Sequence, residues 1–240
     1  MKTIKIILAL VFVTTLTSCQ FDMNIGHVNG NGNVVTEERE VNQDFDQVRG
    51  SRGLDVYLTE GNENKIVVEA DENLLDLIET EISNGKLTIT SSKNIGRAKS
   101  KKVHVTYVKL NKIEASSGAD IIGNSVIKSE TLVLDSSSGA DIEVEVFTKE
   151  LYAETSSGAD IEVSGKATSL NARASSGSDL DAKKLEVINC KAKASSGADI
   201  TVNVQGNLDA KASSGGDVKY YGNPVSVTKK DGSSGSIRKM

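Results

Sequence analysis

Ser156-Ser157-Gly158-Ala159-Asp160-Ile161 is the stretch that decides the fold, because close copies of it recur through the second half of the 240-residue chain. Ser-Ser-Gly occurs seven times between Ser116 and Gly235, and in six copies an Asp follows two residues after the Gly. Successive glycines of the motif are 21, 19, 19, 20, 18 and 20 residues apart. A period of about 20 residues predicts a solenoid, in which each repeat buries its apolar face by stacking on its neighbours.

Apolar and polar residues alternate on both sides of each motif. Leu151 and Ala153 lie on one side of Gly158, and Ile161 and Val163 on the other. This period of two predicts two short strands per repeat, joined by a tight corner in which Gly adopts a positive φ and Ser hydroxyls bond the turn backbone. We therefore predict an all-β fold, a single-stranded parallel β-helix, with an antiparallel meander as the alternative.

The N-terminus reads as a secretory signal. Basic Lys2 and Lys5 precede an apolar run at residues 6–13 and the sequence Leu16-Thr17-Ser18-Cys19. The pattern resembles that of bacterial lipoproteins and predicts a signal peptide at residues 1–18, lipidation of Cys19 and a lipid-anchored protein of the cell envelope. Gln20, by resemblance to the enterobacterial sorting rule, favours the outer membrane. The alternative is an ordinary cleaved signal with an incidental Cys.

The mature chain divides by composition. Residues 19–33 are polar and rich in Gly and Asn, which predicts a lipidated flexible tether. Residues 34–240 are predicted to form a single β-helix domain, with an irregular β portion at 34–110 and the Ser-Ser-Gly-x-Asp repeats at 111–240. Residues 49–56 resemble a degenerate corner, and Asn84-Gly85 predicts a hairpin. The irregular portion is expected to cover one end of the solenoid, because an open end of a parallel sheet is a sticky edge.

The inventory of reactive side chains argues against an enzyme. Cys190 has the repeat phase of inward leucines and is expected to be buried, while His27 and His104 lie outside the repeats. No catalytic triad can be assembled from these residues, and neither a cofactor nor a metal is predicted. A carbohydrate-active enzyme stays as an alternative, either a glycosidase that uses carboxylates alone or a lyase that uses Arg173 and nearby Asp residues.

The charge of the chain bears on its partners. The formal net charge is −5 at pH 7, and nucleic acid or anionic lipid would require a clustered basic face. The sequence therefore predicts no nucleic-acid partner and membrane contact only through the lipid anchor. It does not set an oligomeric state.

The repeated Asp is the main candidate for a ligand or cation face. About 4.8 Å between stacked coils would bring neighbouring carboxylates into repulsion of roughly 0.9 kcal/mol per pair in a water-like dielectric. Either each Asp is held by turn N–H groups and Ser hydroxyls, or the row contacts Ca²⁺ or a periodic polyol such as a glycan. The candidate residues are Asp120, Asp141, Asp160, Asp179, Asp199 and Asp217, with Ser116, Ser137, Ser156, Ser175, Ser195 and Ser213 expected beside them.

The repeated Ser-Ser-Gly-Ala-Asp-Ile, together with Gly53-Leu54-Asp55-Val56-Tyr57-Leu58 and Gly85-Lys86-Leu87-Thr88-Ile89, resembles the auto-transporter adhesin "head GIN domain" family of Bacteroidetes-type bacteria. The resemblance covers roughly residues 40–230 and implies a right-handed β-helix shaped like the pectin lyases but without their catalytic residues. It also implies a non-enzymatic role in adhesion, with a polysaccharide or a host or cell-surface ligand as partner. The alternative is a structural or regulatory envelope protein with no glycan ligand.

Overall fold

The computed structural model describes residues 26–232 and 234–240 and is a parallel β-solenoid of about seven turns with an irregular N-terminal β portion. Its strands are β1 (His27–Val28), β2 (Val34–Arg39), β3 (Gln47–Gly50), β4 (Asp55–Glu60), β5 (Lys65–Asp71), β6 (Ile78–Ser83), β7 (Lys86–Ser91), β8 (Asn94–Ile95), β9 (Lys101–Tyr107), β10 (Lys112–Ser116), β11 (Asp120–Gly123), β12 (Ile127–Ser137), β13 (Asp141–Ser156), β14 (Asp160–Ser175), β15 (Asp179–Ser195), β16 (Asp199–Ser213), β17 (Asp217–Tyr221), β18 (Ser226–Asp231) and β19 (Ser236–Lys239). The predicted fold class is confirmed. The predicted signal peptide and Cys19 lie outside the described residues.

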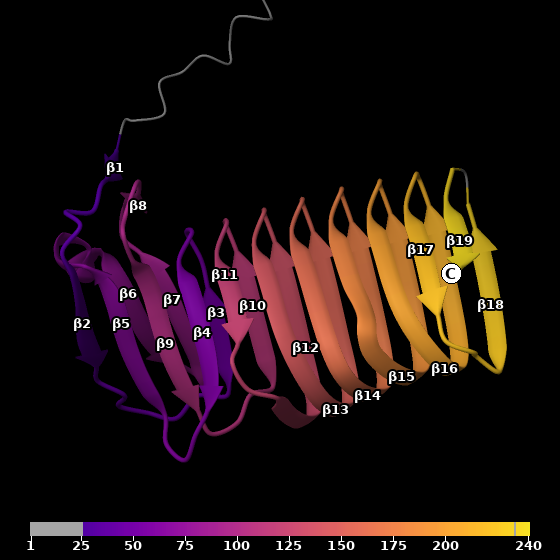
Figure 1. The fold of residues 1–240 in the computed structure, drawn as a ribbon, viewed down its shortest axis with the longest axis horizontal. Coiled ribbons are helices and arrows are strands. Elements are labelled where there is room, and N and C mark those ends of the chain that lie inside the picture. Colours follow the sequence, from indigo (N-terminus) through magenta and orange to yellow (C-terminus); the bar gives the residue numbers. More distant parts are fainter. Residues whose placement is uncertain (1–25, 233) are drawn as a thin grey trace, which may run out of the picture.

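Each coil stacks on the next with residues of equal repeat phase in register. Ile142 pairs with Ile161 and Val144 with Val163 where β13 meets β14, and both strands run in the same direction. Figure 1 shows the corners as one row of narrow loops along the upper edge, from β10 and β11 to the C-terminal coil. The stack therefore places outward side chains of equal repeat phase in lines parallel to its long axis.

The core consists of columns of aliphatic side chains, one from each coil. Leu151 pairs with Leu170 and Leu170 with Cys190, and these three side chains are at most 4% exposed. Burial raises the pKa of the Cys190 thiol to about 12, so this Cys is a buried apolar residue, as its repeat phase predicts. Ala172 and Ala192 form a second inward column with Ala153, and all three are at most 1% exposed.

The corners consist of two consecutive residues with positive φ. In the third Ser-Ser-Gly copy these are Ser157, at 57°, and Gly158, at 68°. The N–H of Gly139 donates to the carbonyl of Ser157, 3.2 Å away in the next corner. The hydroxyl of Thr155 donates to the Ala159 carbonyl from inside the coil, at 2.6 Å. The corner is therefore held by a backbone hydrogen bond to the neighbouring corner and by a hydroxyl from inside the coil. Gly158 supplies the positive φ that the sequence predicts.

An N-terminal cap (residues 27–46 and 61–110) covers one end of the stack. Its strands β2, β5 and β9 pair antiparallel, and β6 and β7 form the hairpin predicted at Asn84-Gly85. A 3₁₀ helix, η2 (Glu72–Leu77), links β5 to β6. The predicted degenerate corner is also confirmed, since Arg52 and Gly53 have φ of 59° and 70° and the coil of β3 and β4 stacks on that of β10 and β11.

Residues 27–33, expected to belong to a flexible tether, are an ordered part of this cap. β1 pairs with β8, and the N–H of Gly32 donates to Asp71 Oδ2 at 2.8 Å. Burial opposes ionisation of Asp71, but N–H donors of Gly32, Ser100 and Lys99 outweigh it and lower the pKa of this carboxyl. The tether prediction is wrong for these residues, because a buried acceptor in the cap binds their backbone.

The C-terminal residues complete one further coil. After Pro224, β18 pairs with β16 and β19 pairs with β17, and Ser236 occupies the position opposite Asp217. Within the described ranges, no helix has the length and apolar composition needed to cross a bilayer.

Candidate functional site

The six predicted Asp residues form one continuous row on the strands that leave the corners. Asp120 pairs with Asp141, and each Asp pairs with its equivalent through to Asp217. The row has a seventh member, because Asp55 pairs with Asp120. Its signal was present in Gly53-Leu54-Asp55, which copies the spacing of Gly-Ala-Asp. We call these seven side chains the carboxylate row: Asp55, Asp120, Asp141, Asp160, Asp179, Asp199 and Asp217.

The carboxylates have few hydrogen-bond partners. Within the described part of the chain, the N–H of Asp179 donates to Asp160 Oδ1 at 3.2 Å, and no Ser hydroxyl bonds a carboxylate of the row. The expectation that turn N–H groups and hydroxyls hold each Asp is therefore wrong for most of the row. The backbone N–H groups of the row also donate to carbonyls of the preceding coil, as Asp160 N–H does to Ala140 at 3.0 Å and Asp179 N–H to Ala159 at 3.3 Å.

Burial and mutual repulsion raise the pKa of three of these carboxyls. Partial burial is the larger cause for Asp120, Asp141 and Asp179, and the charge of a neighbouring Asp is the second. The N–H of Asp160 opposes the shift at Asp141, and nearby Lys101 opposes it at Asp120. Repulsion between neighbouring carboxylates therefore adds to burial in opposing ionisation at these three positions.

A second acidic column strengthens the negative field in the middle of the row. Glu143, Glu162 and Asp181 pair in register two residues beyond Asp141, Asp160 and Asp179. Lys184 binds Glu162 at 2.7 Å, and Lys219 lies 3.6 Å from Asp199 near the C-terminal end. The stretch from Asp141 to Asp179 is therefore the most acidic part of this face.

The predicted Ser residues flank the corners on the other side. Ser156 pairs with Ser137 and Ser175, on the strands that enter the corners, whereas the carboxylate row lies on the strands that leave them. Among the described residues, no group of three or more His, Cys, Asp or Glu side chains is placed to hold a metal ion. His104 lies on the cap, stacked on Tyr57 with ring centroids 5.3 Å apart and 3.3 Å from Glu69 Oε2.

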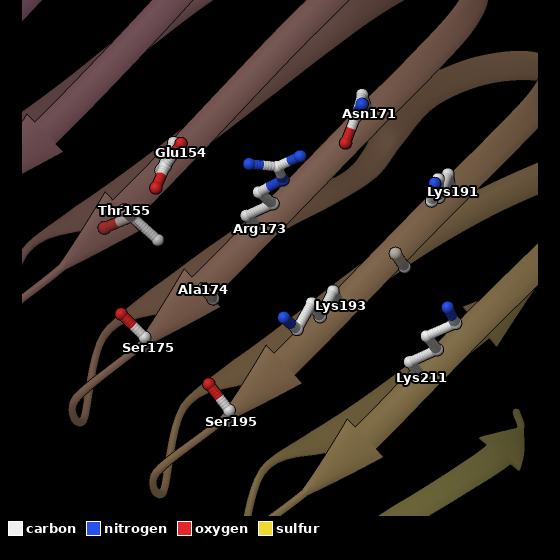
Figure 2. Close-up of a pocket in the computed structure, with 11 residues that line it drawn as sticks. Glu154, Thr155, Asn171, Arg173, Ala174, Ser175, Lys191, Lys193, Ser195 and Lys211 are labelled. Atoms are coloured by element: carbon white, nitrogen blue, oxygen red, sulfur yellow. The ribbon is translucent and has the colours of Figure 1, made fainter. Parts of the chain in front are cut away.

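A basic groove lies on the strands that enter the corners and was missed by the sequence reasoning. Arg173, Lys191, Lys193 and Lys211 line this hollow of about 430 Å³, together with Glu154. Figure 2 shows Arg173, Lys193 and Lys211 on three successive strands. The net charge of the chain does not reveal this local cluster of basic side chains, and the absence of a nucleic-acid partner stays a prediction.

A signal for the groove exists in the repeat phase. The residue four positions before each motif Gly is acidic in the first three copies and basic in the next three: Glu114, Asp135, Glu154, Arg173, Lys193 and Lys211. Register places these residues in one column, so charges far apart in the sequence become neighbours. The net charge of the whole chain hides this separation, because the acidic and basic parts of the column cancel.

Comparisons with known proteins agree with this architecture. The family model described as "putative auto-transporter adhesin, head GIN domain" matches residues 44–224. A crystal structure of a "putative adhesin" from Bacteroides fragilis is similar with a TM-score of 0.82 and 18% identity, covering 89% of this chain and all of that one. Another, from Parabacteroides merdae, gives 0.70 and 22%, over 90% and 99% of the two chains.

A "putative lipid binding protein" from Parabacteroides distasonis has the same fold, with a TM-score of 0.72 and 20% identity over 89% of this chain and 99% of that one. No curated protein matches the chain. At these identities the solved structures establish the fold, whereas the family model extends over most of the sequence. The chain belongs to the "putative auto-transporter adhesin, head GIN domain" family.

Proposed function

We propose that the protein is a non-enzymatic adhesin of the cell envelope, lipid-anchored at Cys19 in the outer membrane, that contacts a polysaccharide or another surface ligand through the carboxylate row. The family and two of the similar solved structures are named as adhesins, which supports a cell-surface or envelope protein. The lipoprotein pattern around Cys19 supports the anchor.

The observation that carries the proposal is a carboxylate that recurs from coil to coil but accepts few hydrogen bonds from the N–H groups and hydroxyls around it. Like charges opposite each other on neighbouring strands destabilise a sheet, and this chain repeats the arrangement along seven coils. A sequence that keeps such a conflict across its repeats is expected to gain something from it at a functional surface. The corner itself does not require the carboxylate, since Ser236 occupies the same position in the last coil.

The row suits a ligand that is itself periodic. Each coil offers carboxylate acceptors on one side of the corner and a half-buried Ser hydroxyl on the other, at the spacing of about 4.8 Å set by the sheet. A polyol chain lying along the stack would meet acceptors at each coil, and several weak contacts would add through multivalency. Ca²⁺ fits less well, because it takes six to eight oxygen ligands.

The test is binding to a glycan array by the triple variant Asp141→Asn, Asp160→Asn, Asp179→Asn. We expect this variant to lose most binding to the neutral glycans of the array while still melting as a folded solenoid, because the amides remove the charge but keep the size. The matched control is Asp76→Asn, Glu79→Gln, Glu81→Gln, which removes three exposed charges from the cap. Wild-type protein that binds no glycan, or a triple variant that binds as well as wild type, would contradict the role of the row.

Exposure on intact cells tests the location separately. Protease added to whole cells is expected to cleave the protein, because an adhesin must reach its ligand. Protection from protease until the cells are lysed would contradict the adhesin proposal.

A further inference from the structure

The basic groove is a second surface, distinct from the carboxylate row, and we propose that it binds a linear anionic polysaccharide. The groove lies on the opposite side of the corners from the row, on β13, β14, β15 and β16. Arg173 pairs with Lys193, Lys193 with Lys211, and Lys211 with Lys230 of the last coil. These four residues form one column of cations over four successive coils, and Lys191 lies beside it on β15.

The cations that line the groove differ from other surface lysines in their contacts, although Glu154 lies opposite Arg173 and Asp209 opposite Lys191 on the neighbouring strands. Within residues 26–232 and 234–240, the four cations that line the groove take part in no ion pair, whereas lysines on other faces do, such as Lys149 with Glu130 and Lys166 with Glu186. Like charges directly opposite each other in a sheet are unfavourable. An anion that lies between them would relieve the repulsion, so the groove is complementary to negative charge.

The remaining lining is suited to sugar hydroxyls. Ser175 and Ser195 lie where β14 and β15 run into their corners, as Figure 2 shows, and Asn171 presents an amide at the end of the group away from the corners. A neighbouring hollow of about 370 Å³ shares Asn171 and Lys191 with the groove and adds Tyr152, whose side chain is 44% exposed. Hydroxyl, amide and aromatic groups around a line of cations match a ligand that is both polyhydroxylated and anionic.

The arrangement favours a polysaccharide over other polyanions. The cations follow one line across the coils at about 4.8 Å per step, close to the advance of one sugar ring in an extended chain. Glu154 closes the line at its N-terminal end, where the column becomes acidic. A nucleic-acid duplex carries a dense charge over a wide body, whereas the cations of the groove form one narrow column.

A membrane surface is a poorer fit than a glycan. Peripheral membrane binding usually combines basic residues with apolar side chains that enter the lipid. The exposed Phe147 and Ile188 line a different hollow, shared with Lys128, Lys149 and Lys166, and not the basic groove. The groove therefore has the charge for an anionic surface but lacks the large aliphatic residues that would insert.

The experiment compares binding of polygalacturonate, a linear carboxylated glycan, by wild type and by Lys191→Gln, Lys193→Gln, Lys211→Gln. We expect wild type to bind polygalacturonate but not neutral dextran, with affinity that falls as salt is added. We expect Kd for the triple variant to rise by about tenfold or more, because it loses three charge-assisted contacts. The matched control, Lys149→Gln, Lys166→Gln, Lys184→Gln, removes the same charge elsewhere and should change Kd less than about threefold.

Several outcomes would overturn the proposal. These are no binding of polygalacturonate by wild type, equal loss in both triple variants, or tighter binding of duplex DNA or of phosphatidylglycerol vesicles through the same lysines. If the triple variant folds poorly, the single charge reversal Lys193→Glu is measured in its place and should also weaken polygalacturonate binding. The Asp141→Asn, Asp160→Asn, Asp179→Asn variant should retain polygalacturonate binding, so failure of the carboxylate-row proposal and failure of this one are distinguishable.

Discussion

Leu170→Ala is expected to lower the free energy of unfolding by about 2–5 kcal/mol. Leu170 is 2% exposed and stacks between Leu151 and Cys190 in the inward column. Backbone hydrogen bonds fix the coils on both sides, so the coils cannot move together to fill the cavity that the substitution leaves. Urea denaturation followed by circular dichroism measures the change.

A control substitution on the exposed side of the same strand tests whether the loss of stability is specific to inward positions. Thr168 lies on the same strand with its side chain exposed, and Thr168→Ala should change the free energy of unfolding by no more than about 0.5 kcal/mol. If the two variants were equally stable, Leu170 would not lie in a packed column, and the assignment of inward positions from the repeat phase would be wrong.

Replacing the central carboxylates is expected to stabilise the fold. The variant Asp141→Asn, Asp160→Asn, Asp179→Asn removes repulsion between these residues and their neighbours Asp120 and Asp199. At about 4.8 Å per pair, and with screening by salt, we expect a gain of roughly 1–2 kcal/mol in the free energy of unfolding at neutral pH. Most surface substitutions do not stabilise, so the sign of the change is informative.

The pH dependence follows from the direction of the pKa shifts. Folding raises the pKa of Asp120, Asp141 and Asp179 above the ordinary value of 3.8. The stability that these groups contribute is therefore complete below about pH 3.8 and is lost as the pH rises through their raised pKa values. The Asn variant should lose much of this dependence, so its advantage over wild type should shrink as the pH falls.

The stability that the cap contributes has the opposite pH dependence. The useful quantity is therefore the difference in stability between the Asn variant and wild type. A hydrogen bond from Ser100 is the largest cause of a lowered pKa for Glu69, and the pKa of Asp71 is also lowered. These groups contribute stability above their ordinary pKa values that is lost as the pH falls through the lowered ones. Subtracting the melting temperature of wild type from that of the Asn variant at each pH removes the contribution of the cap, because both proteins share it. A variant less stable than wild type at neutral pH would show that the carboxylates support the corners.

The repeat phase was sufficient to predict the scaffold. Period-two alternation around each Ser-Ser-Gly placed Leu151, Leu170 and Cys190 on one inward column, and the structure confirms all three. The hairpin at Asn84-Gly85 was also predictable, since both residues need a positive φ that Asn and Gly adopt readily. These features depend on local preferences and on one period, and both can be read from the sequence.

Features that depend on the next coil could not be read in the same way. Whether a carboxylate meets an N–H depends on the direction of that N–H, and here it donates to a carbonyl of the preceding coil, as from Asp160 to Ala140. Docking of residues 27–33 depends on Asp71, which is distant in sequence but accepts the Gly32 N–H. The basic groove required a comparison of charges at equal phase across coils, which overall composition hides.

The most direct test of the account is a carbon-detected NMR titration of the side-chain carboxyls of Asp120, Asp141 and Asp179. The account predicts pKa values above the ordinary 3.8 for all three, with the value for Asp141 falling when Asp160 is replaced by Asn. Values at or below 3.8 would contradict it. The carboxylates would then be held by donors within the corners, and the row would be part of the turn rather than a surface left free for a ligand.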